Sequence, residues 1–351
     1  MDLTSFRTLG RSGLVVSPMA LGTMTFGTPR WGASDEASRA LFDAYVEAGG
    51  NFVDTADIYA AGRSETLLGG FIADRSLRDR IVLATKFTWN ADPGNPNAGG
   101  NGRKNVHRAL DASLRRLRTD YVDCYWLHFW DMVTPCEEVL QTMGDLVRAG
   151  KVRYWALSDV PAWYATKLAV LAEARGVPGP IALQMEYSLV ERTLEREHVP
   201  AARECGLGIT PWSPLAGGFL ADKYRQGDKP AAGRLSGGNP FGDSKFTEKN
   251  WRLLDALRGV AAEAGAPAAA VALAWALGRP GISALLLGAS RPEQLRDNLS
   301  ALRLVLGAGQ LETLDRASAL DAAFPYSGFT PQVRRSIFGG ATVQGWRDNP
   351  A

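Results

Sequence analysis

Eight short apolar runs recur along the chain, and a longer stretch of mixed polarity follows each of them. No run exceeds eight residues, and most are rich in β-branched or aromatic residues, which is typical of strands buried on both faces. The runs occupy 18–23, 52–56, 81–87, 121–128, 152–159, 181–188, 208–214 and 282–288. Strands that alternate with helices pair in parallel through right-handed crossovers, so this repetition limits the chain to a few α/β topologies.

The stretches between these runs show helical patterning. Several carry apolar residues at i, i+3, i+4 and i+7, as an amphipathic helix does. Ser34 is a suitable N-cap for the first of them and Gly49 a suitable stop. The predicted helices are 34–49, 63–73, 105–119, 135–151, 161–176, about 196–205, 266–281 and 291–302.

Eight strand–helix units in 351 residues favour a closed (β/α)8 TIM barrel, of the α/β class, over an open doubly wound sheet. An open sheet would usually carry a G-x-G-x-x-G turn after its first strand, and none is present. No linker or internal repeat divides the chain, so we expect one domain over 1–351, with a barrel core at about 15–303 behind an N-terminal capping segment. A C-terminal helix and tail follow at 304–351, and long loops follow the third and seventh strands at 88–104 and 215–246. Both loops leave the strand ends where barrel active sites are built.

The composition excludes several classes of function. The net charge of +2 is too small for a nucleic-acid footprint, and no run of eighteen apolar residues suggests a membrane span. The polar N-terminus shows no secretory signal. Cys124, Cys136 and Cys205 lie far apart, which indicates reduced thiols and a cytoplasmic protein. No two of the three histidines have metal-ligand spacing, so we expect no metal. The outer helix faces show no patch that would fix an oligomeric state.

Four ionisable residues fall at the C-terminal ends of consecutive predicted strands. Asp54 lies on the second strand and Tyr59 just beyond it, Lys86 ends the third strand, and His128 ends the fourth. Each alone has an ordinary explanation as a loop anchor, a packing residue or a solvated strand end. Together, however, three successive strands would bring these groups to one mouth of the barrel. This arrangement indicates a shared chemical role for the four residues.

These residue types suit proton transfer. A lysine ammonium beside a tyrosine favours the phenolate and should lower the pKa of Tyr59 from about 10. A buried Lys86 needs a counter-charge, which Asp54 can supply. Tyr59 would then give a proton to a developing alkoxide near neutral pH, while His128 hydrogen-bonds the substrate oxygen. This set of residues has no nucleophile, so another molecule must supply the electrons.

Seven motifs, in order between about residues 6 and 303, resemble the NADPH-dependent, bacterial-type members of the aldo-keto reductase superfamily. They are DTADIYAAGRSE, LATKF, RALDASLRRLRTDYVDCYWLH, ALSDV, LQMEYSLVER, TPWSPLAGGFL and LLGASRPEQLRDNLSAL. The resemblance implies a (β/α)8 barrel that binds NADPH without a Rossmann domain, with a catalytic tetrad of Asp54, Tyr59, Lys86 and His128. It implies the reversible reduction of an aldehyde or ketone by hydride from nicotinamide, with Tyr59 as general acid.

The same resemblance implies a set of residues that bind the cofactor. Towards the nicotinamide it places Gly22, Thr23, Met24, Asp54, Ser158, Asp159 and Gln184, with the Trp212 ring stacked beneath. Towards the phosphates and adenosine it places Ser213, Pro214, Leu215, Gly217, Lys223, Arg234, Gly288, Ser290, Arg291, Gln294 and Asn298. Arg291 favours NADPH over NADH, because a guanidinium makes a forked contact with a 2′-phosphate. Asp159 stands where the family normally has Asn, and an ionised carboxylate offers no donor.

The resemblance implies a small carbonyl compound or alcohol as the substrate. The candidates for its site are Tyr59, His128, Phe26, Trp31, Trp89 and Phe129, with Trp130 and the tail residue Phe324 as further aromatic candidates. Sugars, aromatic aldehydes, steroids and polyketide-like ketones all stay open as substrates. An alternative function is a cofactor-sensing regulatory or interaction barrel with little turnover, as in channel-associated relatives of the family.

Overall fold

The computed structural model describes residues 1–29, 31–227, 234–236 and 245–344. The chain divides into two compact units, Met1–Ser318 and Ala319–Ala351, which we describe separately. The predicted loop 215–246 and the C-terminal tail lie partly outside the described residues. Whether the whole chain acts as one domain stays a prediction.

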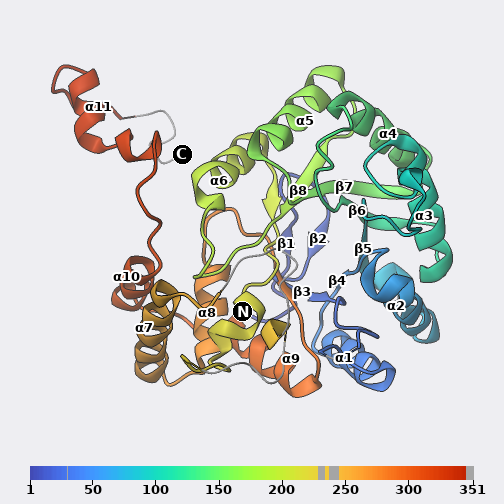
Figure 1. Cartoon of the computed structure of the whole chain (residues 1–351), viewed down its shortest axis with the longest axis horizontal. Coiled ribbons are helices and arrows are strands. Elements are labelled where there is room, and N and C mark those ends of the chain that lie inside the picture. The colour runs from blue at the N-terminus through green and yellow to red at the C-terminus, as the bar shows by residue number, and fades with distance from the viewer. Residues whose placement is uncertain (30, 228–233, 237–244, 345–351) are drawn as a thin grey trace. The chain divides into compact units, whose positions relative to one another are not determined.

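The first unit is the predicted (β/α)8 barrel (Figure 1). Its parallel strands run in the order β10-β3-β4-β5-β6-β7-β8-β9. A bridge between Ile209 and Ile282, and a hydrogen bond of 2.9 Å from Leu286 N to Pro211 O, connect the two ends of this sheet. The strands are β3 (Met19–Gly22), β4 (Phe52–Asp54), β5 (Val82–Phe87), β6 (Val122–Leu127), β7 (Val152–Ser158), β8 (Pro180–Gln184), β9 (Gly208–Ile209) and β10 (Leu285–Leu287).

The eight predicted helices are confirmed within a few residues at each end. Ser34 caps the first one, because its side chain accepts a hydrogen bond from Ala37 N. The helices are α1 (Asp35–Glu47), α2 (Arg63–Asp74), α3 (Arg103–Leu117), α4 (Cys136–Arg148), α5 (Ala162–Arg175), α6 (Leu194–Cys205), α8 (Ala268–Leu277) and α9 (Pro292–Leu299). The short 3-10 helices are η1 (Tyr59–Gly62), η2 (Arg78–Arg80), η3 (Pro96–Ala98), η4 (Ala216–Ala221), η5 (Arg234–Ser236) and η6 (Ser300–Arg303).

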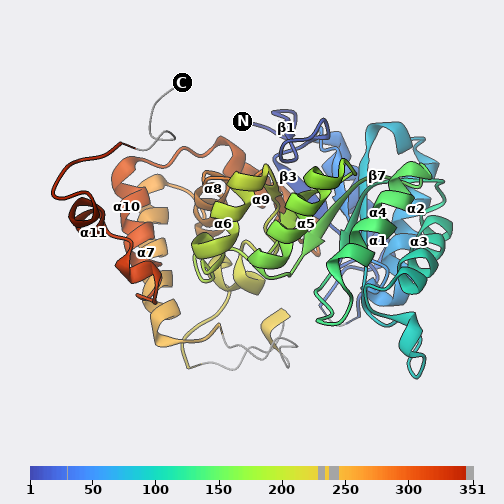
Figure 2. The ribbon, with the colours of Figure 1, turned by 90° about the horizontal axis from the view of Figure 1, so that it is seen from above.

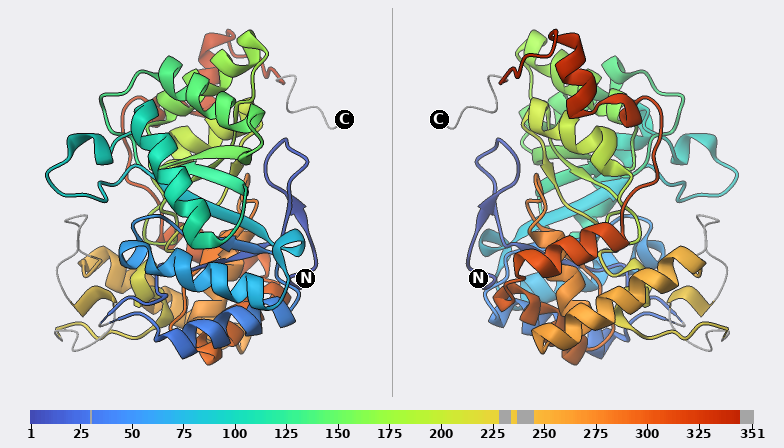
Figure 3. Two further views of the ribbon diagram at one scale, coloured as in Figure 1. Left: turned by 90° about the vertical axis from the view of Figure 1, so that its right-hand side faces the viewer. Right: turned by 90° about the vertical axis from the view of Figure 1, so that its left-hand side faces the viewer.

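Two elements differ most from the predicted pattern, and a helix is present in the segment 304–351 where a C-terminal helix was expected. β9 ends at Ile209 instead of 214, because Pro211 and Pro214 cannot donate to a strand ladder. An extra helix, α7 (Glu248–Ala264), precedes α8, and α10 (Ala308–Ala317) ends the first unit. Figure 3 shows α7 and α10 side by side on the outside of the barrel. The second unit holds η7 (Tyr326–Gly328) and α11 (Pro331–Ile337).

Asp315 fastens α10 to its neighbours. Its carboxylate accepts hydrogen bonds from Trp275 Nε1 at 2.9 Å and from Arg279 Nη1 at 3.0 Å, both in the region of α8. Arg192, just before α6, adds a third contact at 3.4 Å. In the described part of the chain, no single helix has the length and apolar character to cross a membrane, and only α7 with α8, bent by 95° at their junction, would satisfy that test together.

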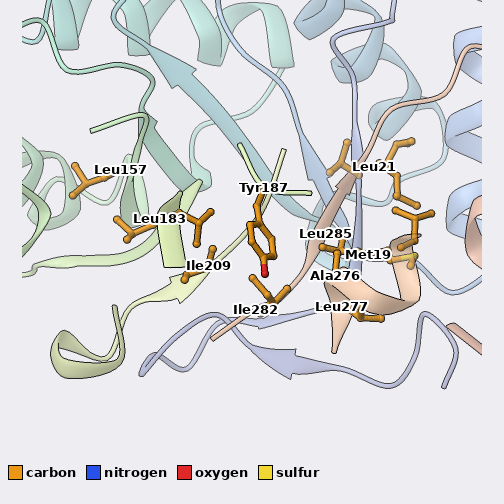
Figure 4. Close-up of a cluster of buried hydrophobic side chains, with 14 of the residues drawn as sticks. Met19, Leu21, Leu157, Leu183, Tyr187, Ile209, Ala276, Leu277, Ile282 and Leu285 are labelled. Carbon is orange, nitrogen blue, oxygen red and sulfur yellow. The ribbon is translucent and has the colours of Figure 1, made fainter. Parts of the chain in front are cut away.

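Leucine and alanine alternate along the strands and separate two apolar layers. The leucines pack outward against the helices, and Figure 4 shows part of this layer. They are Leu21, Leu83, Leu157, Leu183 and Leu285. The alanines face the barrel interior, where their small size leaves room for Phe52 and Trp126. They are Ala20, Ala84, Ala156, Ala182 and Ala284.

A hairpin of β1 (Arg7–Thr8) and β2 (Val15–Val16) closes the N-terminal end of the barrel. Figure 2 shows it at the end opposite to the loop 88–104. Leu9 and Leu14 in this hairpin pack against the interior side chains. Gly10 has a φ of +63°, and a Cβ there would lie 2.4 Å from Ile181 O, so only glycine fits at this close approach. The opposite end of the barrel is therefore the one left for a site.

Candidate active site

The alternation that makes the barrel interior also places polar side chains at its open end. Every second residue of a strand faces the barrel interior. This spacing continues to the last inward-facing positions of β4, β5, β7 and β8, and to the residue after β6. They carry Asp54, Lys86, Ser158, Gln184 and His128. Except for His128, which is half-buried, all of these residues are buried. Five consecutive strands therefore bring polar groups together at one mouth.

Lys86 lies at the centre of this group. Its ammonium contacts the Asp54 carboxylate, donates to Thr55 O at 2.9 Å, and lies 3.5 Å from the Tyr59 hydroxyl. Burial alone would lower the pKa of Lys86, but Asp54 and Tyr59 together raise it, so Lys86 stays charged. Burial raises the pKa of Asp54 although Lys86 and a hydrogen bond of 3.2 Å from Gln184 Nε2 oppose the rise. The ion pair is thus held in a dry environment with its hydrogen bonds satisfied.

Tyr59 begins η1, directly after the loop from β4. Ala60 and Ala61, the next two residues, have φ values of 47° and 54°, in the left-handed region that alanine rarely adopts. Burial raises the pKa of Tyr59; Lys86 lowers it as expected but by less than burial raises it. The predicted net lowering of this pKa is therefore wrong. Tyr59 rests fully protonated, which still suits a proton donor.

His128 lies beside Tyr59, with ring centroids 5.8 Å apart and the planes at 79°. Burial, and then the charge of Lys86, hold the pKa of His128 well below its usual range, so the imidazole is neutral. Its Nδ1 is buried without a hydrogen-bond partner among the described residues. A neutral imidazole here can donate one hydrogen bond to a substrate oxygen without competing for the proton of Tyr59.

A hydrogen-bonded chain that the sequence analysis did not identify fixes His128. Thr88 Oγ1 accepts from His128 N at 3.2 Å and lies 2.6 Å from Asn101 Oδ1. Asn101 Nδ2 donates to Phe129 O at 3.0 Å. Asn101 is fully buried within the loop 88–104. A buried amide in a Gly/Pro/Asn loop has no sequence signal that separates it from the exposed asparagines around it.

Asp159 and Trp212 form a second polar group at the mouth. The indole Nε1 of Trp212 donates to Asp159 Oδ1 at 3.0 Å, and Ser158 Oγ donates to Asp159 Oδ2 at 3.4 Å. Burial raises the pKa of Asp159 to about 7, although both hydrogen bonds lower it. Gln184, expected at the nicotinamide carboxamide, instead donates to Asp54. Thr23 is also engaged, because its N–H and hydroxyl both donate to Asp54 O.

Two cations lie together near the start of α9. Arg291 is the N-cap of α9. Burial first, and then the charge of Arg291, lower the pKa of Lys223. Neither Lys223 nor Arg291 makes an ion pair among the described residues, so no carboxylate offsets the repulsion between the two like charges. Gly288 has open space where a Cβ would point. This charge pattern, at a helix N-terminus, fits a bound phosphate.

The other residues expected at this end are more occupied. Gln294 Oε1 accepts from Ser290 N at 3.0 Å and from Ser290 Oγ at 3.1 Å, and Asn298 is buried. Arg234 Nη1 donates to Ser213 Oγ at 3.2 Å, and its guanidinium lies 5.9 Å from the Trp31 ring centroid. Gly217, with a φ of 66°, lies in η4 beyond Pro214 and Leu215. Met24 and Gly22 lie at the end of β3.

The candidate substrate residues divide into two groups. Trp89 is 42% exposed and lies 6.3 Å from the His128 ring and 5.6 Å from the Phe129 ring, which gives an aromatic row leading out from Tyr59. Phe26, by contrast, is fully buried and packs on Phe71 at 6.3 Å, so it belongs to the core and does not line the mouth. Phe324 lies in the second unit and is exposed.

A buried acidic pair below the Tyr59 loop was also missed. Both carboxylate oxygens of Asp57 are buried and lack hydrogen-bond partners among the described residues. Burial first, and then the charge of Glu65, raise the pKa of Asp57 to about 7, against Arg116 and Arg108. Glu65 is fully buried and holds Arg116 Nε at 2.6 Å and Thr85 Oγ1 at 2.5 Å. In the part of the chain described, no three such residues are grouped as a metal site would require.

The matches to known proteins agree with this geometry. The Aldo/keto reductase family model matches residues 18–319. The chain belongs to the aldo/keto reductase family. An aryl-alcohol dehydrogenase of Pestalotiopsis microspora is 34% identical over 329 residues, covering 91% of this chain and 84% of the relative. A norsolorinic acid reductase of Aspergillus flavus is 34% identical over 323 residues, covering 90% and 81%.

A third relative is named for a different role. A probable voltage-gated potassium channel subunit beta of Oryza sativa subsp. japonica is 35% identical over 305 residues, covering 86% of this chain and 92% of the relative. Together with the family match, the first two relatives support an oxidoreductase that acts on a small carbonyl compound. Members of this family generally use NAD(P)H.

Proposed function

We propose that this aldo/keto reductase reduces an aldehyde or ketone to an alcohol with NADPH, reversibly, and that Tyr59 is the general acid. The observation that carries the proposal is the position of Lys86 Nζ, which contacts Asp54 and lies 3.5 Å from the Tyr59 hydroxyl. The neutral ring of His128 lies beside the same hydroxyl. A proton donor, the group that polarises it and a neutral hydrogen-bond donor thus converge at one mouth.

The roles of these side chains follow from their charges. Bound NADPH would supply the hydride. Tyr59 stays protonated until an alkoxide, a far stronger base than a phenolate, develops on the substrate oxygen. Lys86 stabilises the phenolate left behind, and Asp54 keeps Lys86 charged and in place. His128 orients the carbonyl oxygen by a hydrogen bond. In the oxidation of an alcohol, the same residues act in reverse.

The residues suit NADPH in their donor chemistry. Lys223 and Arg291, near the start of α9 and without an ion pair among the described residues, would hold the 2′-phosphate with Ser290, and NADH lacks this group. Towards the nicotinamide, we assign Gly22, Thr23, Met24, Asp54, Ser158, Asp159, Gln184 and Trp212. Towards the rest of the dinucleotide, we assign Ser213, Pro214, Leu215, Gly217, Arg234, Gly288, Gln294 and Asn298.

We further propose an aromatic carbonyl compound as the substrate. The Trp89 ring lies 6.3 Å from the His128 ring and 5.6 Å from the Phe129 ring, and the Arg234 guanidinium lies 5.9 Å from the Trp31 ring. A flat aromatic substrate would stack on such rings. The names of two relatives, an aryl-alcohol dehydrogenase and a norsolorinic acid reductase, agree with this class. A cytoplasmic location and action of the whole chain as one domain stay predictions.

The test is NADPH consumption with a panel of aliphatic, sugar and aromatic carbonyl compounds, run alongside NADH. We expect Tyr59→Phe to lower kcat on the best substrate by about 10²–10⁴-fold while NADPH binding persists. Tyr121→Phe is the matched control, because Tyr121 lies before β6 near the closed end, between Arg78 and Arg153. A Tyr59→Phe protein that reduces carbonyls at the parent rate would refute the assignment.

A second candidate function follows from the rice relative. A cofactor-sensing barrel would bind NADPH tightly and turn over negligibly on every carbonyl compound in the panel. The match to a potassium channel beta subunit over 86% of this chain favours keeping this candidate. Measurements on the parent protein alone distinguish the two functions, since both require NADPH binding but only the reductase requires turnover.

A further inference from the structure

The carboxyl group of Asp159 is rigidly presented at the mouth. Asp159 directly follows β7 with a φ of 46°, a left-handed conformation that aspartate tolerates. Its N–H donates to Gln184 O at 3.2 Å, and its carbonyl accepts from Trp130 N at 3.3 Å. The backbone is therefore held on both sides, and the hydrogen bonds from Trp212 Nε1 and Ser158 Oγ hold the carboxyl group.

Every hydrogen-bond donor to this carboxyl group is neutral. Trp212 Nε1 and Ser158 Oγ each take one oxygen, and no lysine or arginine among the described residues forms an ion pair with Asp159. Asp54, at the same mouth, differs in having the Lys86 ammonium in contact. A carboxylate has about four acceptor positions, so Asp159 keeps unused capacity for a positive group.

The charged groups that face Asp159 do not neutralise it. Glu186, beyond β8, raises the pKa of Asp159, and its own counter-charge is Lys245 at 2.9 Å. Lys86 lowers the pKa of Asp159 but is already bound to Asp54 and Thr55 O. With burial as the largest cause, the pKa of Asp159 reaches about 7, so its charge changes across the neutral range.

We propose that Asp159 makes this site prefer the oxidised, cationic nicotinamide over the reduced, neutral one. The proposal rests on the proposed function, in which the nicotinamide lies against Trp212, the ring that donates to Asp159. NADP+ carries a positive charge on that ring and NADPH does not. A nearby carboxylate without a counter-ion therefore stabilises only the oxidised form.

The preference must depend on pH with a fixed sign. Above the pKa of Asp159 the carboxylate is charged and NADP+ is favoured; below it the carboxyl is neutral and the preference is lost. Through Asp159, the enzyme-bound equilibrium is then shifted towards oxidised cofactor and alcohol as the pH rises. We expect the ratio of the dissociation constants, Kd of NADPH over Kd of NADP+, to rise about tenfold across the neutral range.

In the ratio of the two dissociation constants, other causes of pH dependence cancel. The 2′-phosphate, the pyrophosphate and the side chains that bind them act equally on both forms, so any pH dependence of these contacts cancels. Both constants are measured by isothermal titration calorimetry at several values from about pH 6 to about pH 8.5, on both sides of the Asp159 pKa. No turnover is needed.

Asp159→Asn removes the charge and keeps the shape. We expect its ratio to be independent of pH and to equal the parent value at the acid end. Asp255→Asn is the matched control, because Asp255 lies exposed on α7 and gives the same change in net charge. Its ratio should follow the parent at every pH.

Three outcomes decide the proposal. A parent ratio that rises with pH and an Asp159→Asn ratio that does not would support it. A parent ratio that is flat, or an Asp159→Asn ratio that rises like the parent, would overturn it and leave the proposed function intact. Failure of the parent to bind either form would overturn both. A flat parent ratio overturns the proposal even if the variant does not fold.

Discussion

The two ends of this barrel treat their polar groups differently. At the end closed by β1 and β2, Asn51 accepts from Ser17 N at 2.8 Å and donates to Val15 O at 3.0 Å, so its amide is satisfied at both atoms. At the open end, His128 Nδ1 and the Asp57 carboxylate are buried without partners among the described residues. Unsatisfied buried groups cost stability, so their presence where the chemistry is proposed indicates a site kept ready for other partners.

If the open end serves chemistry, replacing both members of the Lys86–Asp54 ion pair by neutral residues should leave the fold stable but abolish activity. Lys86→Met leaves Asp54 charged and buried, which should destabilise the fold by about 3–5 kcal/mol and lower kcat by about 10²–10⁴-fold. Adding Asp54→Asn removes the stranded charge. We expect the double variant to regain most of the stability and none of the activity.

Urea unfolding followed by tryptophan fluorescence and NADPH oxidation with the best carbonyl substrate measure the two effects. A double variant that regains both stability and activity would contradict a chemical role for the pair. A single variant as stable as the parent would show that Asp54 accepts a proton at little cost.

The closed end should show the reverse pattern. Leu9 is fully buried in the interior cluster, so Leu9→Ala should cost about 2–5 kcal/mol of unfolding free energy and leave kcat/KM of the folded protein unchanged. Val15→Ala in the same hairpin is the control, because Val15 is 46% exposed and its loss should cost little. A fall in kcat/KM with Leu9→Ala, measured well below the unfolding transition, would mean that the two ends are coupled.

Most of the fold could be predicted from the sequence, because the strands and helices depend on local patterns. Ser34 caps α1 as its residue type suggests, and β4, β5 and β6 lie where the apolar runs place them, with Asp54, Lys86 and His128 at or just beyond their ends. The β1–β2 hairpin was missed because two-residue strands leave no periodic signal. α7 was missed because the count of eight strand–helix units was complete without it.

The candidate site was predicted in its residue types but not in its energetics. The direction of the Lys86 effect on Tyr59 follows from charge alone, whereas the net pKa depends on burial, which no sequence pattern shows. Gln184 could be placed at the mouth, but its contact with Asp54 depends on the register of β7 with β8. Asp57 gave no signal, because its unpaired state is a property of how α2 and α3 pack around it.

Asp57 gives the last test of the difference between the two ends. Burial and Glu65 raise its pKa to about 7, against about 4 in an unfolded chain. Below about pH 4 both states carry the proton and Asp57 contributes nothing. Between about pH 4 and pH 7 the unfolded chain loses the proton first, so the free energy of unfolding falls as the pH rises, and above that range the full cost remains.

Asp57→Asn removes this titration, so it should stabilise the protein, and more so at high pH. We expect the gain over the parent to grow by about 2.5 kcal/mol between about pH 5 and about pH 8, measured by urea unfolding. Asp145→Asn is the control, since Arg148 and Arg103 hold the pKa of the half-buried Asp145 below its usual value. It should cost stability by an amount that stays constant between about pH 5 and about pH 8, because Asp145 is ionised in both states there. A gain that does not change with pH would mean that Asp57 has a partner in solution. The carboxylate of Asp57 at the open end would then have its hydrogen bonds satisfied, as the amide of Asn51 at the closed end does.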